Sequence, residues 1–251
     1  MKTGLVSVSF RKLSAGVIVD LAVKCGLDGI EWGGDLHVPP GDIALARAVG
    51  AATRANGLEV ACYGTYYRLT DAETEIAPAV IDTAKALGAP LIRVWAGVCG
   101  SRDASDAQRE EICRNARAFV RLAAQAGIDV AFEWHGGTLT DSLDSALQLL
   151  ADVPGAHTLW QPPVGMKPDE CAAQIRAAAA HIRNIHVFSW EGTHRLPLQA
   201  GAGKWRVCME EIRKLPGERY MLLEFVAEDD VRQLECDAQT LHRWLRGAWS
   251  E

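Results

Sequence analysis

The chain has 251 residues, 49% of them hydrophobic, and a formal net charge of -6. This length suits either one large α/β barrel or two ordinary domains. The charges are spread along the sequence without a basic stripe, which argues against a nucleic-acid partner. No apolar run approaches the roughly 20 residues that span a bilayer, and the N-terminus shows no signal-peptide pattern. We therefore expect a cytoplasmic protein with no membrane partner.

Seven cysteines lie far apart in the sequence and form neither CxxC pairs nor zinc-ligand spacings. Scattered thiols in an odd number are typical of small core residues in a reducing compartment, with a catalytic thiol as the alternative. The cysteines give no reason to expect a structural zinc site.

One junction recurs along the chain: a helical stretch ends at a glycine, and a short apolar strand follows within a residue or two. It occurs at residues 25–32, 56–63, 87–95 and 126–133. The glycine serves as a left-handed C-cap that closes the helix and turns the chain into the next strand. The interval of roughly 30 to 40 residues matches one βα unit.

Eight such units can be counted through the chain. Strands are expected near residues 4–10, 28–34, 58–64, 90–97, 128–134, 156–161, 183–190 and 219–226. Helices are expected over 14–25, 41–56, 72–87, 104–126, 140–152, 168–181, 204–214 and 230–248. Continuously apolar strands and this size predict a (β/α)8 TIM barrel that spans 1–251 as a single domain. A doubly wound open sheet is the alternative, but no GxGxxG turn follows the first strand.

The active site of such a barrel lies at the C-terminal ends of its strands. Four polar residues at the ends of adjacent strands form the candidate metal site: Glu133, Gln161, His186 and Glu224. Two carboxylates, an imidazole and an amide oxygen suit Mn²⁺, Mg²⁺ or Co²⁺ better than structural zinc. A metal there could polarise a substrate carbonyl, with the two glutamates as catalytic proton acceptor and donor. The alternatives are a core histidine, a salt-bridged glutamate and an amide that only caps its strand.

A further group of residues at strand ends and in the following loops is rich in aromatic rings, which is typical of a small-molecule pocket. Flat apolar faces with polar groups between them suit a sugar ring, although tryptophans could also close a barrel by packing alone. The candidate substrate-binding residues are Glu31, Trp32, His37, Tyr63, Arg93, Trp95, His135, Trp160, Trp190 and Arg195.

Over essentially the whole chain these residues resemble the xylose isomerase-like TIM barrels, the sugar phosphate isomerases and epimerases. The most specific points of likeness are residues 29–32, residues 132–137, the strand that carries His186, and residues 223–225. The resemblance implies one divalent metal, Mn²⁺ first and Mg²⁺, Co²⁺ or Zn²⁺ as alternatives, held by Glu133, His186 and Glu224. Gln161 stands where the family usually has aspartate, so the site would carry one negative charge less.

The resemblance also implies an activity: isomerisation or epimerisation of a ketose or keto-sugar, with Glu133 and Glu224 as the acid/base pair and an enediolate as intermediate. A metal-dependent lyase or dehydratase acting on a keto-sugar derivative is an alternative that uses the same site and the same first proton abstraction. A non-catalytic sugar-binding barrel is the third reading. The expected partner is a small carbohydrate, and because related barrels often dimerise, a homodimer is one expected assembly.

Overall fold

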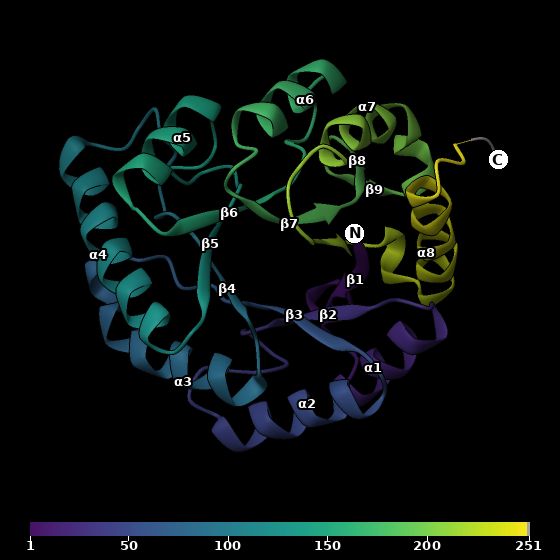
Figure 1. Cartoon of the computed structure of the whole chain (residues 1–251), viewed down its shortest axis with the longest axis horizontal. Helices are drawn as coiled ribbons and strands as arrows, with labels where there is room; N and C mark the ends of the chain where they lie inside the picture. Colours follow the sequence, from purple (N-terminus) through teal and green to yellow (C-terminus); the bar gives the residue numbers. More distant parts are fainter. Residues whose placement is uncertain (250–251) are drawn as a thin grey trace.

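The computed structural model describes residues 1–249 and shows a closed barrel of eight parallel strands in the order β1-β10-β7-β6-β5-β4-β3-β2. Its strands are β1 (Lys2–Val6), β2 (Gly29–Gly33), β3 (Glu59–Gly64), β4 (Leu91–Val94), β5 (Asp129–Glu133), β6 (Ala156–Trp160), β7 (Ile182–Val187) and β10 (Tyr220–Leu223). The helices α1 (Ala15–Lys24), α2 (Ile43–Ala55), α3 (Ala77–Leu87), α4 (Asp106–Gln125), α5 (Leu143–Asp152), α6 (Pro168–Ala177), α7 (Ala202–Ile212) and α8 (Val231–Leu245) surround the barrel (Figure 1). This arrangement confirms the predicted (β/α)8 barrel.

Three expected elements end earlier or divide. The first strand stops at Val6, because residues 7–10 form the 3-10 turn η1 (Ser7–Phe10). The helix expected over 72–87 divides into η2 (Asp71–Ile76) and α3, whose first turn contains Pro78. The last strand ends at Leu223, and Phe225 adopts a left-handed backbone with φ of 52°. That turn brings the chain out of the barrel directly after Glu224.

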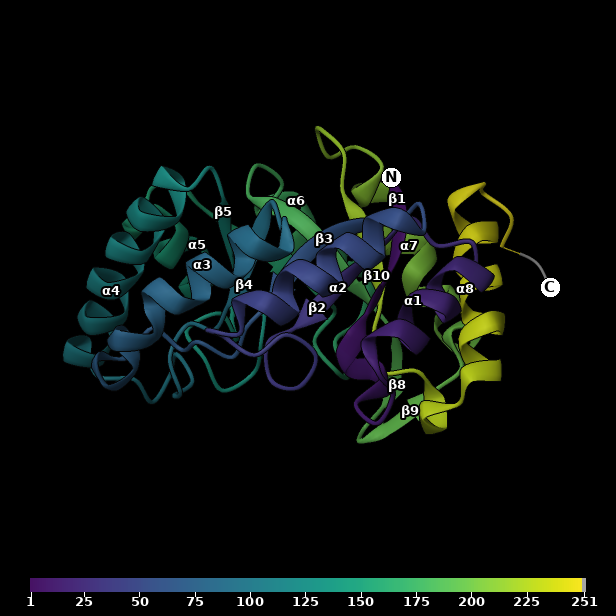
Figure 2. The ribbon, with the colours of Figure 1, turned by 90° about the horizontal axis from the view of Figure 1, so that it is seen from below.

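The seventh expected strand is also shorter than 183–190, because residues 189–196 form a separate hairpin. Its strands, β8 (Ser189–Glu191) and β9 (His194–Leu196), pair antiparallel outside the barrel. The hairpin projects beyond the barrel at one end, near the N-terminal end of α8 (Figure 2). The short turn η3 (Leu198–Gly201) leads from it into α7, and η4 (Ala227–Asp229) precedes α8.

Two interior layers of side chains place the site. Cys62, Leu91, Ala131 and Leu159, one from each of β3 to β6, form a small buried apolar cluster separate from the main core. Side chains two residues apart on a strand face the same way, so Gly64, Arg93, Glu133 and Gln161 lie in the next layer toward the C-terminal ends. The main core lies between strands and helices. The barrel interior is therefore apolar in the middle of the strands and charged at their C-terminal ends.

None of the helices in residues 1–249 combines the length and the apolar composition that a membrane span requires.

Candidate active site

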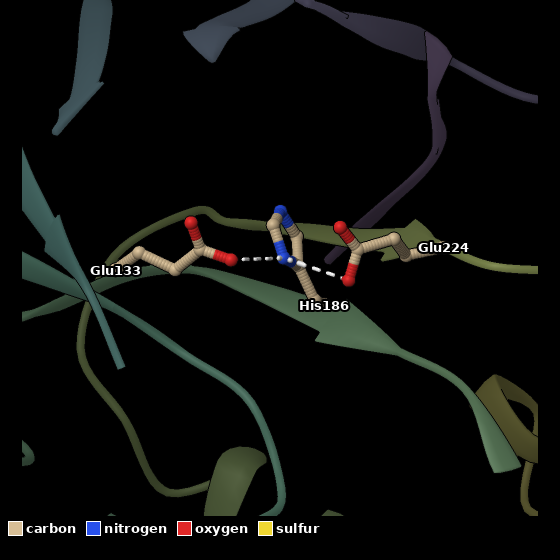
Figure 3. Close-up of side chains that lie close together, drawn as sticks. All are labelled: Glu133, His186 and Glu224. Atoms are coloured by element: carbon tan, nitrogen blue, oxygen red, sulfur yellow. Dashed lines mark ion pairs between the residues drawn. The ribbon is translucent and has the colours of Figure 1, made fainter. Parts of the chain in front are cut away.

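His186 on β7 stands at the centre of the charged layer, between Glu133 and Glu224 (Figure 3). Its Nδ1 lies 3.2 Å from Glu224 Oε2 and 3.8 Å from Glu133 Oε1. Gln161 Oε1 lies 3.2 Å from the same nitrogen. The imidazole and both carboxylates are almost completely buried. The structure thus brings the four predicted ligand residues together around one nitrogen atom.

The carboxylates around His186 control its protonation. Burial alone would lower the pKa of His186, but the neighbouring carboxylates of Glu224 and Glu31 raise this pKa to about 10. A proton on the imidazole is therefore stabilised wherever no other cation balances the carboxylates. A metal ion bound by Glu133, His186 and Glu224 would supply the positive charge in place of this proton.

The donor set fits a divalent cation. One donor atom each from Glu133, His186 and Glu224 lie within 4.8 Å of one another. Glu224 Oε2 is buried and accepts no hydrogen bond within the described part of the chain. Three buried carboxylates, counting Glu31, against the single guanidinium of Arg93 leave two negative charges when His186 is neutral. A divalent cation would balance them, and an uncompensated buried charge is costly.

Arg93 on β4 ties two of these carboxylates together. Its Nε donates a hydrogen bond to Glu31 Oε1 at 3.0 Å, and its Nη1 pairs with Glu133 Oε2. Trp95 Nε1 donates to the same Glu133 oxygen at 2.6 Å. Burial disfavours the charged forms, yet the carboxylates raise the pKa of Arg93, and His186 and Arg93 together lower the pKa of Glu31. Glu133 therefore has Oε2 fully engaged and turns Oε1 toward His186.

Above this layer opens a cavity of about 400 Å³ with largely aromatic walls. On one side the rings of Trp95 and His135 stack with centroids 4.2 Å apart. On the other side Trp190 packs edge-on against Phe188 and Phe225. A volume of this size accommodates a small ring-shaped or short-chain molecule.

The neighbouring residue determines the tautomer of His135. His135 Nδ1 lies 2.6 Å from the carbonyl oxygen of Gly136. Because a carbonyl can only accept, Nδ1 carries the proton in the neutral ring, and Nε2 carries the lone pair. His135 lines the cavity, so this residue could act there as a general base.

Among the predicted substrate-binding residues, Arg93, Trp95, His135 and Trp190 line this cavity. Arg93 does so with its charge already paired to Glu31 and Glu133. Glu31 does not line it, because its fully buried carboxylate binds Arg93 and His186 below the cavity floor.

Three predicted pocket residues face away from the cavity instead, which corrects our expectation. Trp32 Nε1 donates to Thr53 Oγ1 on α2 at 3.1 Å, and Tyr63 donates to the carbonyl of Val38 at 2.8 Å. Trp160 Nε1 donates to Gln174 Oε1 on α6 at 3.2 Å. Each is fully buried, with its polar atom bound by the protein. Trp32 and Trp160 therefore stabilise contacts between strand and helix, and Tyr63 stabilises the loop after β2.

His37 and Arg195 also lie outside the cavity lining. The ring of His37 is buried between Ser7 Oγ at 3.0 Å and the Leu13 carbonyl at 3.1 Å. Arg195, on β9, holds its guanidinium 4.7 Å from the ring centroid of Phe225 and pairs with Asp229. His37 comes from the loop after β2 and Arg195 from the β8–β9 hairpin, and the pattern of barrel strands determines the path of neither segment.

The cavity is also lined by residues that belong to the aromatic strand-end group or its loops but were not named as substrate-binding candidates: Tyr66, Trp134, Asp141, Phe188 and Phe225. All except Asp141 come at or just after strand ends, which is the same signal that identified Trp95 and His135. Asp141 belongs to the loop after β5 and carries no such signal.

The chain belongs to the xylose isomerase-like TIM barrel family, whose family model matches residues 19–248. A 3-dehydroshikimate dehydratase from Bacillus anthracis is 27% identical over 248 residues, which cover 85% of this chain and 87% of the relative. The structure of the probable 3-DHS dehydratase AsbF from Bacillus anthracis has a TM-score of 0.82 at 23% identity and covers 96% of this chain and 99% of that one. A D-allulose 3-epimerase from Methylomonas sp. has a TM-score of 0.76 at 15% identity, with 97% of each chain covered. These two structures share the fold of this chain.

Proposed function

We propose that this protein is a divalent-metal-dependent lyase that removes water from a hydroxylated keto acid of the 3-dehydroshikimate class. The relative that covers most of the chain is a dehydratase. The observation that carries the proposal is the asymmetry of the acid/base groups. In the cavity wall, Nε2 of His135 carries a lone pair because Nδ1 binds the Gly136 carbonyl, whereas Oε2 of Glu133 already accepts from two donors.

Elimination needs a single proton-transfer group on one face of the substrate. The base removes a proton from the carbon next to the carbonyl, and the electron pair of that C–H bond forms a C=C bond. The C–O bond of the β-hydroxyl then breaks, and its oxygen takes a proton and leaves as water. His135 Nε2 would accept the first proton and return it to the departing oxygen, so that one residue serves both steps.

The metal-site residues would support this step from the cavity floor. A divalent metal held by Glu133, Gln161, His186 and Glu224 would polarise the carbonyl and so make the neighbouring proton easier to remove. Arg93 and Trp95 would hold the Glu133 carboxylate in place. The stacked Trp95 ring would hold the imidazole of His135 against rotation.

Epimerisation of a ketose is the second candidate. It needs two acid/base groups on opposite faces of the substrate, and Glu133 and Glu224 do stand on either side of His186 (Figure 3). The D-allulose 3-epimerase shares this barrel. The engaged Oε2 of Glu133 counts against it, because a carboxylate that binds Arg93, Trp95 and a metal has little capacity left to accept a proton from the substrate.

The test is to incubate Mn²⁺-loaded protein with 3-dehydroshikimate and to follow the near-ultraviolet absorbance of a conjugated product. A parallel incubation of D-allulose or D-fructose in D₂O, read by NMR, tests for epimerisation. Elimination should occur, and His135→Asn should lower its rate at least about 100-fold, the usual range of a general base. His181→Asn, at the opposite end of the barrel, is the control. Deuterium exchange into a ketose without any elimination would replace the lyase by the epimerase.

A further inference from the structure

Glu31 does not line the cavity, yet its carboxylate connects two candidate metal ligands: it contacts His186 directly and Glu133 through Arg93. It is completely buried on β2. Glu31 Oε2 lies 3.1 Å from His186 Nε2, and Glu31 Oε1 accepts the hydrogen bond of Arg93 Nε at 3.0 Å. Strands β1 and β10 separate β2 from β7 in the barrel, so the Glu31 side chain reaches His186 across the interior.

The contact with Glu31 determines which nitrogen of His186 is available. An ionised carboxylate can only accept a hydrogen bond, so the proton of a neutral His186 ring belongs on Nε2. Nδ1 then carries the lone pair, and this is the nitrogen that faces Gln161, Glu133 and Glu224. A carboxylate behind a ligating histidine fixes both its tautomer and its ring orientation.

The contact with Arg93 extends the same control to a second ligand. Arg93 bridges Glu31 and Glu133, with all three side chains at most 4% exposed. Without the carboxylate of Glu31, the guanidinium would keep only Glu133 as an anionic partner and would be free to move toward it. Glu133 Oε1 would then lose its fixed direction toward His186.

Gly64 on β3 provides the space for this bridge. A Cβ atom at this position would lie 2.5 Å from Glu31 Oε1 and 2.7 Å from Arg93 Nη2, which is closer than such atoms can approach. Gly64 is not among the glycines with positive φ, so its backbone would accept alanine. The requirement for glycine at position 64 is therefore a requirement for space beside the ion pair.

We propose that Glu31 is the positioning residue of the metal site: it presents Nδ1 of His186 and, through Arg93, the carboxylate of Glu133 to one divalent cation. Gly64 completes this arrangement by leaving room for the Glu31–Arg93 pair. The inference rests on the proposed metal dependence, but it concerns two residues that contact neither the metal nor the substrate.

The experiment measures binding of Co²⁺ alone, because this ion reports both its affinity and, through its visible absorption, its ligands. Glu31→Gln keeps the size of the side chain but removes the charge that orients both partners. Gly64→Ala keeps every charge but displaces the pair. Glu110→Gln, on the exposed face of α4, and Gly16→Ala, where a Cβ meets no atom within 4 Å, are the matched controls. Circular dichroism shows whether each variant is folded.

Glu31→Gln and Gly64→Ala should each weaken Co²⁺ binding by about 10- to 100-fold, the usual effect of losing an outer-shell carboxylate, and change the Co²⁺ absorption bands. The two controls should bind Co²⁺ as the unmodified protein does. If Glu31→Gln does not fold, Gly64→Ala carries the test. Unchanged affinity and unchanged bands in the folded variants would overturn the role of Glu31 alone. Absence of Co²⁺ binding by the unmodified protein would overturn the metal-dependent function as well.

Discussion

Arg93 should contribute strongly to stability, because within residues 1–249 it is the one cation besides His186 that pairs with the buried carboxylates of the site. Its side chain is 2% exposed, and its partners Glu31 and Glu133 are 0% and 4% exposed. Replacing it by methionine keeps most of the volume but leaves both carboxylates without their partner. Removing one member of a buried pair typically costs about 3–5 kcal/mol.

We therefore expect Arg93→Met to lower the free energy of unfolding by about 3–5 kcal/mol, close to a third or more of the stability of an ordinary domain. For a chain of this length the loss corresponds to a fall in Tm of roughly 6–20 °C. The free energy of unfolding of Arg93→Lys should lie between those of the unmodified protein and Arg93→Met, because one ammonium group cannot bind two carboxylates in the geometry of a guanidinium.

Urea unfolding at pH 7 in the presence of a chelator, followed by circular dichroism, measures the effect. Arg114→Met is the control, since Arg114 pairs with Asp71 on the surface with both side chains more than half exposed. Its loss should change the unfolding free energy far less, because solvent screens exposed pairs. Equal stabilities of Arg93→Met and Arg114→Met would refute the view that Arg93 neutralises the site.

Three further predictions concern Gln161, Trp32 and His37. Gln161→Asp adds a negative charge to the ligand set and should tighten Mn²⁺ binding by on the order of tenfold in calorimetry; weaker binding would show that Gln161 is not a ligand. Trp32→Phe loses the hydrogen bond to Thr53 and leaves a cavity at a fully buried position, so it should cost about 1–3 kcal/mol of stability with Mn²⁺ affinity unchanged, whereas a loss of affinity would place Trp32 in the site. Burial lowers the pKa of His37, so the unfolded chain takes up the proton more readily and stability should fall as pH drops below about 6.5. His37→Gln should flatten the dependence of unfolding free energy on pH between about 5 and 6.5, and an unchanged slope would contradict this assignment.

The barrel could be predicted from sequence because its signals are local. Four helix-to-strand junctions repeat a glycine cap and a short apolar run, and eight βα units leave few architectures. Glu133, His186 and Glu224 could be found because a polar residue at the end of a buried strand needs a partner. That local argument holds without knowledge of which strands are neighbours.

The orientation of the aromatic residues follows from the alternation of side chains along each strand, which the choice of candidates did not apply. Neighbouring residues on a strand face opposite sides. Glu31 and Gln161 turn toward His186 inside the barrel, so Trp32 and Trp160 beside them face outward and bind Thr53 and Gln174. The prediction placed both tryptophans at the correct end of the barrel but on the wrong face.

Arg93 illustrates a different limit. An arginine at a strand end can pair with a carboxylate of the substrate or with one of the protein. Only the folded chain shows that Arg93 pairs with Glu31 and Glu133. Arg195 was misplaced for a related reason, because the β8–β9 hairpin that carries it depends on contacts such as Asp229 that come later in the chain.

We expect the charged layer at the C-terminal ends of the barrel strands to hold one divalent metal. Elemental analysis of protein purified without chelator, or soaked with Mn²⁺ and dialysed, tests it most directly. We predict about one equivalent of metal per chain, lost in Glu224→Ala, in accord with the donor atoms that converge on His186. Protein that retains no metal after the Mn²⁺ soak would contradict the claim and leave Glu133, His186 and Glu224 as the polar floor of a metal-free pocket.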